Sequence, residues 1–135
     1  MRKTVLLATV ALLMSTLMIG DSTTLVRRTE ASQPGAATQV TIPASPTGLT
    51  VTEITSNSIS ISWTDNSSDE DGFRIEKCAG ANCSDFAWLA NMPANVTNIT
   101  EWGLGKNKTY KYRVCAYNSA GNSGYTNDTT ATTTR

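Results

Sequence analysis

The segment Ser58–Trp63 constrains the fold more than any other part of the chain. It alternates strictly, with serine at every second position and an apolar residue between the serines. Because successive side chains of a β-strand point to opposite faces, this alternation places Ile59, Ile61 and Trp63 on one face and the serines on the other. The segment is therefore predicted to be a strand that buries one side.

Shorter alternating runs occur on both sides of this strand, separated by clusters of Asn, Asp, Ser and Gly. Strands about 8–12 residues apart, with no helical pattern between them, are typical of an antiparallel sandwich. We expect about seven strands, near residues 49–51, 58–63, 73–76, 87–92, 96–100, 110–116 and 127–133. The predicted fold class is therefore all-β, with the strands arranged as one antiparallel sandwich.

The first twenty residues have a different character. Arg2 and Lys3 precede an almost unbroken apolar run, Val5–Ile19. A short basic start followed by a short apolar run is typical of a secretory signal peptide, and a membrane-spanning helix needs a longer run of about 20 residues. Residues 1–20 are predicted to be a helical signal peptide, with cleavage as late as residue 31, or retention as an anchor, as alternatives. We expect a secreted or cell-surface protein with no membrane contact in its mature form, unless the segment is retained.

The composition changes again before the strands begin. Residues 21–45 are rich in Thr, Ser, Ala, Gln and Pro and have little apolar area to bury, so they are predicted to be a flexible linker. The alternating runs start after Pro46. We therefore place one folded domain at residues 46–134.

Charge and composition exclude several functions. The chain has 11 basic and 11 acidic residues and no histidine. This balance provides no basic field for nucleic acid. The commonest general base and metal ligand is absent, and the sequence contains no nucleophile elbow, phosphate-binding glycine loop or metal cluster. We therefore predict a non-catalytic protein without cofactor or bound metal.

Two groups of residues resemble a fibronectin type III domain. The first is Trp63 at the end of its strand, preceded by Pro46, Leu49 and Val51; the second comprises Leu104, Tyr110, Tyr112, Arg113, Val114, Ala116, Asn118 and Gly121. The resemblance covers residues 46–134 and implies a seven-stranded immunoglobulin-like sandwich. The loop at residues 65–76 closely resembles bacterial and extracellular-enzyme-associated members of that family, which implies a bacterial exported protein.

The resemblance also assigns structural roles. It places Trp63, Leu104, Tyr112 and Val114 in the core between the sheets. It places Tyr110 at the corner of the sandwich, where the tyrosine hydroxyl of such domains bonds back to the main chain.

The three cysteines leave more than one pairing open. Cys78 and Cys83 bracket a short turn, and related bacterial modules often carry a cysteine pair there, so an exported chain is expected to form this local disulfide. If the third and sixth strands are neighbours, as in the family, a Cys78–Cys115 bridge is an alternative. Otherwise Cys115 is a free thiol or links two chains.

An acidic loop at residues 65–71 allows two interpretations. Asp65, Asp69, Glu70 and Asp71 could supply oxygen ligands to calcium. However, Glu70 stands where a calcium loop needs glycine, so we favour a hydrated turn whose side chains cap the backbone.

The outer face of the sheet formed by the third and sixth strands is the candidate binding surface. It would carry Arg74, Glu76, Arg113, Tyr117 and Tyr125, the last within the loop at residues 119–125. An ordinary solvated face is the alternative. We predict a monomeric extracellular binding or adhesion module that contacts a protein or polysaccharide, or else a structural spacer. Burial of Trp88 and Trp102 would argue against polysaccharide.

Overall fold

The computed structural model describes residues 39–135. The expected signal peptide, residues 1–20, and the expected linker as far as residue 38 lie outside the described residues. Within residues 39–135, no helix has the length and apolar character needed to cross a membrane.

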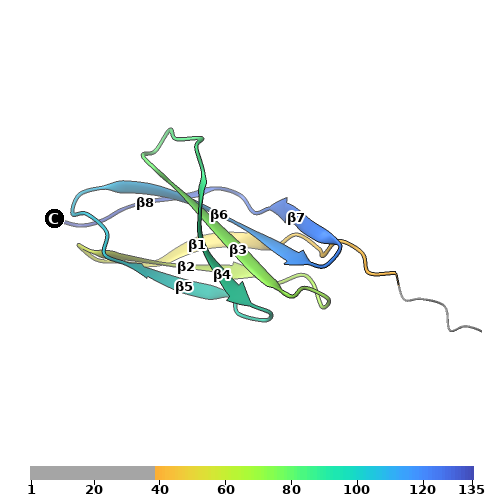
Figure 1. Ribbon diagram of the computed structural model, residues 1–135. Coiled ribbons are helices and arrows are strands. Elements are labelled where there is room, and N and C mark those ends of the chain that lie inside the picture. The colour runs from red at the N-terminus through yellow and green to blue at the C-terminus, as the bar shows by residue number, and fades with distance from the viewer. Residues whose placement is uncertain (1–38) are drawn as a thin grey trace, which may run out of the picture. The chain divides into compact units, whose positions relative to one another are not determined.

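Within residues 39–135, eight strands form two antiparallel sheets (Figure 1). A three-stranded sheet has the order β1-β2-β5, and a five-stranded sheet has the order β4-β3-β6-β7, with β8 also paired to β6. The strands are β1 (Thr47–Ile54), β2 (Ser58–Thr64), β3 (Gly72–Ala79), β4 (Ala87–Pro93), β5 (Asn98–Trp102), β6 (Thr109–Asn118), β7 (Gly121–Tyr125) and β8 (Thr129–Thr132).

The expectation of seven strands is wrong by one. The stretch Gly121–Tyr125, expected to be a loop, is strand β7, and a separate strand β8 follows it. Thr126 bridges the interruption, because its N–H donates to the Val114 carbonyl at 2.8 Å and its hydroxyl accepts from the Val114 N–H at 3.1 Å. The glycines and asparagine of β7 have low strand propensity, which conceals the strand in the sequence.

The predicted strand Ser58–Trp63 is the centre of the three-stranded sheet, paired on both sides. Ile59 and Ile61 are 1% exposed and Trp63 is 5% exposed, so the predicted face is buried. On the other face the hydroxyls of Ser60 and Thr100 are 2.8 Å apart. Period two therefore separates core from surface in this strand.

The core lies between the two sheets. Trp63 packs edge-on against Phe73, with ring centroids 5.5 Å apart. The buried cluster comprises Leu49, Ile59, Ile61, Trp63, Phe73, Ile75, Leu104, Tyr112, Val114, Ala116 and Ala131. These side chains come from both sheets, so the core holds the sheets together by apolar burial.

Two tyrosines add polar links at the edge of this core. The hydroxyl of half-buried Tyr110 accepts the Gly105 N–H at 3.2 Å, which is the backward bond expected at this corner. The Tyr112 hydroxyl donates to Glu101 at 2.8 Å, and Lys77 pairs with the same carboxylate. Burial first, and then the Glu101 carboxylate, raise the pKa of Tyr112. Glu101 on β5 is thus tied to β3 and β6 of the other sheet.

The end of the expected linker contacts the sandwich. The Asn118 side-chain amide donates to the Thr41 carbonyl at 2.8 Å, and Pro46 is buried. Residues 41–46 are therefore held against the domain.

Replacing Trp63 should destabilise the domain strongly. We expect Trp63→Ala to lower the free energy of unfolding by about 3–5 kcal/mol, because it removes a large buried ring from between the sheets. The matched control is Trp102→Ala, since Trp102 is 70% exposed; its effect should stay within about 0.5 kcal/mol. Urea unfolding followed by far-UV circular dichroism measures both, and similar losses would contradict the assignment.

Candidate binding face

The five-stranded sheet turns one face away from the core, and we call this the outer face. Directly paired residues of antiparallel strands share a face. Glu76 pairs with Arg113, Arg74 with Cys115, and Cys115 with Tyr125. Tyr117, two residues beyond Cys115 on β6, shares this face. The structure thus brings together all the residues expected there from the sequence.

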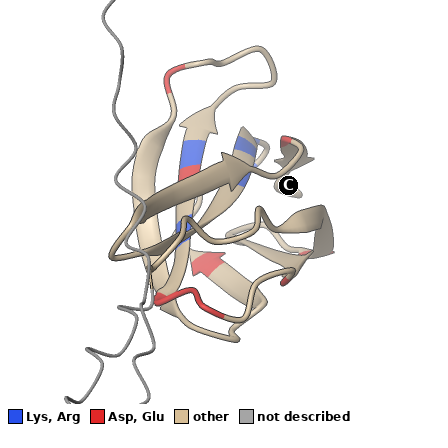
Figure 2. Cartoon of the chain, turned by 90° about the vertical axis from the view of Figure 1, so that its right-hand side faces the viewer, with Lys and Arg blue, Asp and Glu red and all other residues tan. Residues whose placement is uncertain are grey.

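Glu76 lies at the centre of the outer face and is only 5% exposed. Its Oε2 accepts from Arg113 Nε at 2.9 Å and from Arg113 Nη2 at 2.6 Å. Its Oε1 lies 3.1 Å from Arg74 Nε, an ion-pair distance although the N–H is not aligned for a hydrogen bond. Figure 2 shows basic and acidic residues next to each other on the strands. The expectation that Glu76 is a surface contact is corrected, because two arginines cover it.

Two aromatic rings hold the Arg113 guanidinium. Its Cζ lies 4.1 Å from the ring centroid of Phe86 and 3.9 Å from that of Tyr125. Arginine stacks well on aromatic faces, and each such contact is favourable. Arg113 is therefore fixed by a carboxylate and by two rings, and it is not a free charge.

The same network shifts two pKa values. Burial alone raises the pKa of Glu76, but hydrogen bonding to Arg113 and Tyr125 and the positive charges of Arg113 and Arg74 outweigh burial and hold it below its ordinary 4.5. Burial and Glu76 raise the pKa of Tyr125. Glu76 is therefore ionised, and Tyr125 protonated, at neutral pH.

Cys115 lies under this network. It shares the outer face by register, as expected from period two, but it is 0% exposed. Burial, and next the Glu76 carboxylate, raise the pKa of its thiol. Because only the thiolate is a strong nucleophile, burial and the raised pKa both disfavour reaction of Cys115 with a second chain.

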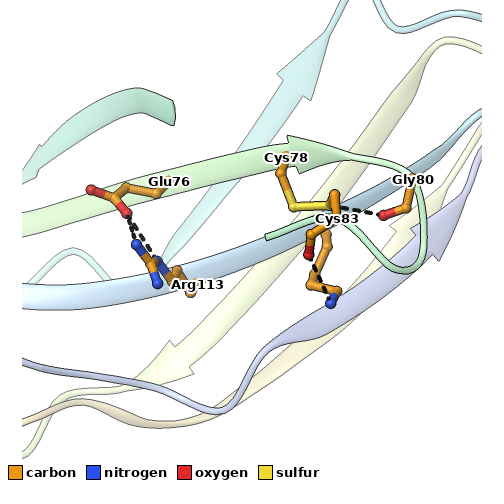
Figure 3. The surroundings of a disulfide bond; sticks show 6 residues. Glu76, Cys78, Gly80, Cys83 and Arg113 are labelled. Carbon is orange, nitrogen blue, oxygen red and sulfur yellow. Dashed lines mark hydrogen bonds and ion pairs between the residues drawn. A yellow bond between two sulfur atoms is a disulfide. The ribbon is translucent and has the colours of Figure 1, made fainter. Parts of the chain in front are cut away.

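The expected Cys78–Cys83 disulfide is present, with Cα atoms 5.9 Å apart. This pairing excludes the Cys78–Cys115 alternative. Figure 3 shows the disulfide beside the Glu76–Arg113 pair. Lys111 Nζ donates to the Cys83 carbonyl at 3.2 Å. The closed loop leads directly into the segment that carries Phe86, so it helps to position that ring on Arg113.

Strand β4 adds two residues to the outer face that the candidate surface lacked. Trp88 pairs with Glu76 and Asn91 with Arg74, and the Trp88 indole N–H donates to the Asn91 side-chain oxygen at 3.0 Å. Trp88 is 60% exposed. Leu89 is the extra residue of a β-bulge between these two pairs. No motif in the sequence indicates this bulge.

Tyr117 lies over a glycine at the end of the outer face. A Cβ on Gly72 would collide with the Met92 carbonyl oxygen and would lie 3.0 Å from the Tyr117 hydroxyl. Glycine therefore allows β4 and the tyrosine ring to approach β3 closely.

The second exposed tryptophan lies elsewhere. Trp102, 70% exposed, pairs with Ser58 on the outer side of the three-stranded sheet. Trp88 and Trp102 are both exposed, so burial of these rings does not argue against polysaccharide binding. They do not form one aromatic surface, because they lie on opposite sheets.

The acidic loop caps the backbone. Asp65 accepts the Ser67 N–H at 2.9 Å, and Glu70, 8% exposed, accepts the Asn95 N–H at 3.3 Å. Among residues 39–135, the one group of three potential metal ligands is Cys78, Cys83 and Asp85, of which the cysteines are in the disulfide. The four acidic side chains of the loop thus form no such group.

Comparisons with known proteins agree with this architecture. A family model of the fibronectin type III domain matches residues 44–132. A crystal structure of titin domains superposes with a TM-score of 0.61 and 25% identity over 70% of this chain and 33% of that chain. A myokine structure superposes with a TM-score of 0.57 and 24% identity, covering 69% of this chain and 99% of that chain. A computationally redesigned β-sandwich protein superposes with a TM-score of 0.57 and 26% identity, covering 67% of this chain and 89% of that chain. The chain spans a third of the titin structure, and it belongs to the fibronectin type III family.

The lowered pKa of Glu76 predicts a pH-dependent stability. Glu76 stabilises the fold above its ordinary pKa of 4.5, and this contribution is lost as pH falls through the lower folded-state pKa. We expect Glu76→Gln to be clearly less stable than the parent at pH 7, with the difference shrinking toward pH 2–3. Urea midpoints across this range test it. The control is Glu53→Gln, at an exposed glutamate on β1, and an unchanging difference for Glu76→Gln would contradict the prediction.

The cysteine assignment predicts a simple thiol count. We expect the oxidised chain to show no reactive thiol in native buffer, because Cys115 is buried, and one thiol per chain in denaturant without reductant. Titration with a chromogenic disulfide reagent measures both values. Three thiols in denaturant would exclude the disulfide, and one in native buffer would exclude the burial of Cys115.

Proposed function

We propose that this fibronectin type III domain is a non-catalytic extracellular binding module that contacts its partner through the outer face of the five-stranded sheet. The observation that carries the proposal is Trp88, a large aromatic side chain that is 60% exposed on that face. Its exposure adds little to the stability of the fold, so a role in contact with another molecule gives a reason for its position.

The organisation of the outer face supports this proposal. Phe86, Arg113 and Tyr125 are stacked, and Glu76 anchors Arg113 from below. Side chains that are already ordered lose less entropy when a partner binds. The face is therefore prepared for contact before any partner arrives.

An extracellular location has two supports. The Cys78–Cys83 disulfide is of the kind that persists in oxidising compartments. The basic start and apolar run at residues 1–20 have the pattern of a secretory signal peptide.

The proposed contact lies on a surface. No pocket is present among residues 39–135, and the whole chain has no histidine. The proposal is therefore for a partner that lies across the sheet and undergoes no reaction there.

A structural spacer is the second candidate, and one observation favours it. The charges of Arg74 and Arg113 are both directed to Glu76 within the domain. A face whose charges are internally paired gives less electrostatic attraction to a partner. The spacer predicts that neither sheet has a specific contact.

Site-specific photo-crosslinking distinguishes these candidates. A benzophenone amino acid replaces Asn122, exposed on the outer face of β7 opposite Tyr117, or Thr100, exposed on the other sheet. Benzophenone inserts into C–H bonds of proteins and glycans alike, so the test does not assume a partner class. We expect a saturable adduct from position 122, and not from position 100, in the extracellular fraction of the producing organism. Equal adducts, or none, would favour the spacer.

A further inference from the structure

We infer that the partner of this face is a polysaccharide of β-linked pyranose units, bound at Trp88, Asn91 and Arg74. These three side chains form the Trp88 row, on the outer face where β4 pairs with β3. The inference rests on the proposed binding function and names the class of ligand.

The Trp88 ring is held in a defined position on the surface. Its indole N–H donates to Asn91 at 3.0 Å, so the orientation of the ring is set by a neighbour on the same strand. The bulge at Leu89 puts the ring on this face, since regular alternation from inward-facing Ala90 would turn residue 88 toward the core. Bulges commonly re-aim side chains in this way at functional sites.

Hydrogen-bond donors lie beside the ring. Asn91 uses its oxygen for Trp88, and its NH₂ group has no partner among the described residues. Arg74 lies opposite Asn91, its side chain is 39% exposed, and only its Nε is paired, with Glu76. An arginine carries five N–H donors, so its terminal groups remain available to hydroxyl oxygens.

An aromatic ring beside hydrogen-bond donors matches both the apolar face and the hydroxyl-bearing edge of a sugar ring. A β-linked pyranose with equatorial substituents exposes a flat face of axial C–H groups that stacks on an aromatic ring. Its hydroxyls project from the edge of the same ring, where amide and guanidinium donors can reach them. Binding sites that combine aromatic surface with a few placed polar groups gain orientation from the polar groups. The Trp88 row supplies both parts.

A protein partner fits less well. Dominant contacts between proteins cluster near the well-packed centre of an interface, whereas Trp88 lies on β4, the edge strand of its sheet. Asn91 and the Arg74–Glu76 ion pair border Trp88, so polar and charged groups lie beside the ring. A flat, extended polysaccharide chain needs no deeper site.

Trp102 provides an internal control of the same chemistry. It is more exposed, at 70%, but no amide or guanidinium side chain is paired across from it. Its cross-strand neighbour is Ser58, which is buried and lies 2.7 Å from the Thr55 hydroxyl. A tryptophan without adjacent free donors offers stacking alone.

The test is depletion of the purified full-length chain from solution by microcrystalline cellulose and by chitin. We expect the parent and Trp102→Ala to bind at least one of them, Trp88→Ala to bind about tenfold or more weakly, and Asn91→Ala to fall between. Thermal unfolding of each variant separates lost binding from lost folding, since residues 88, 91 and 102 are exposed.

Each result has one meaning. Loss with Trp88→Ala but not with Trp102→Ala supports the inference. Equal retention of the two variants, or no retention of the parent on either polysaccharide, overturns it. If the parent is not retained while the position-122 crosslink captures a protein, the polysaccharide inference fails and the binding function stands. If neither experiment gives a specific contact, both fail.

Discussion

The buried carboxylate of Glu76 is the interaction on which the outer face depends. A buried charge is costly unless it is paired, and here Arg74 on the same strand and Arg113 on β6 supply the pairing. The carboxylate in turn fixes Arg113, which provides the flat cation between Phe86 and Tyr125. Removing the carboxylate would leave two positive charges close together. The stack, and the cover over Cys115, would then lose their common anchor.

Different interactions stabilise the two faces of the five-stranded sheet. The inner face buries Phe73, Ile75 and Val114 at 0% exposure, so its stability comes from area removed from water. The outer face buries its central residues with charge pairs and aromatic stacking. This second layer lets the sheet keep ordered side chains on a surface that has no second sheet over it. A contact surface benefits from side chains that are ordered and still accessible, because they lose less entropy on binding.

The alternation of apolar and polar residues predicted the buried side correctly where the strands are regular. It identified the buried side of β2 from Ser58–Trp63, and it placed Arg74, Glu76 and Arg113 on one face. It failed at the interruption near Thr126, where Gly and Asn conceal β7. It also could not show that Glu76 is buried, because Arg113 and the Phe86 and Tyr125 rings that hold it are distant from Glu76 in the sequence. Phe86 lies outside any strand, and its contact with Arg113 depends on how the disulfide loop returns.

The bulge at Leu89 connects the fold to the inferred ligand. Without it, Trp88 would follow Ala90 and Met92 toward the core, whose partly buried margin already contains Leu89 and Met92. The extra residue allows Leu89 to pack inward while Trp88 turns outward beside Asn91. A sandwich gains no burial by exposing a tryptophan, and an edge strand with a regular ladder would pair equally well with β3. Because the backbone irregularity places an ordered aromatic ring beside free donors, the proposed contact surface depends on the local structure of β4.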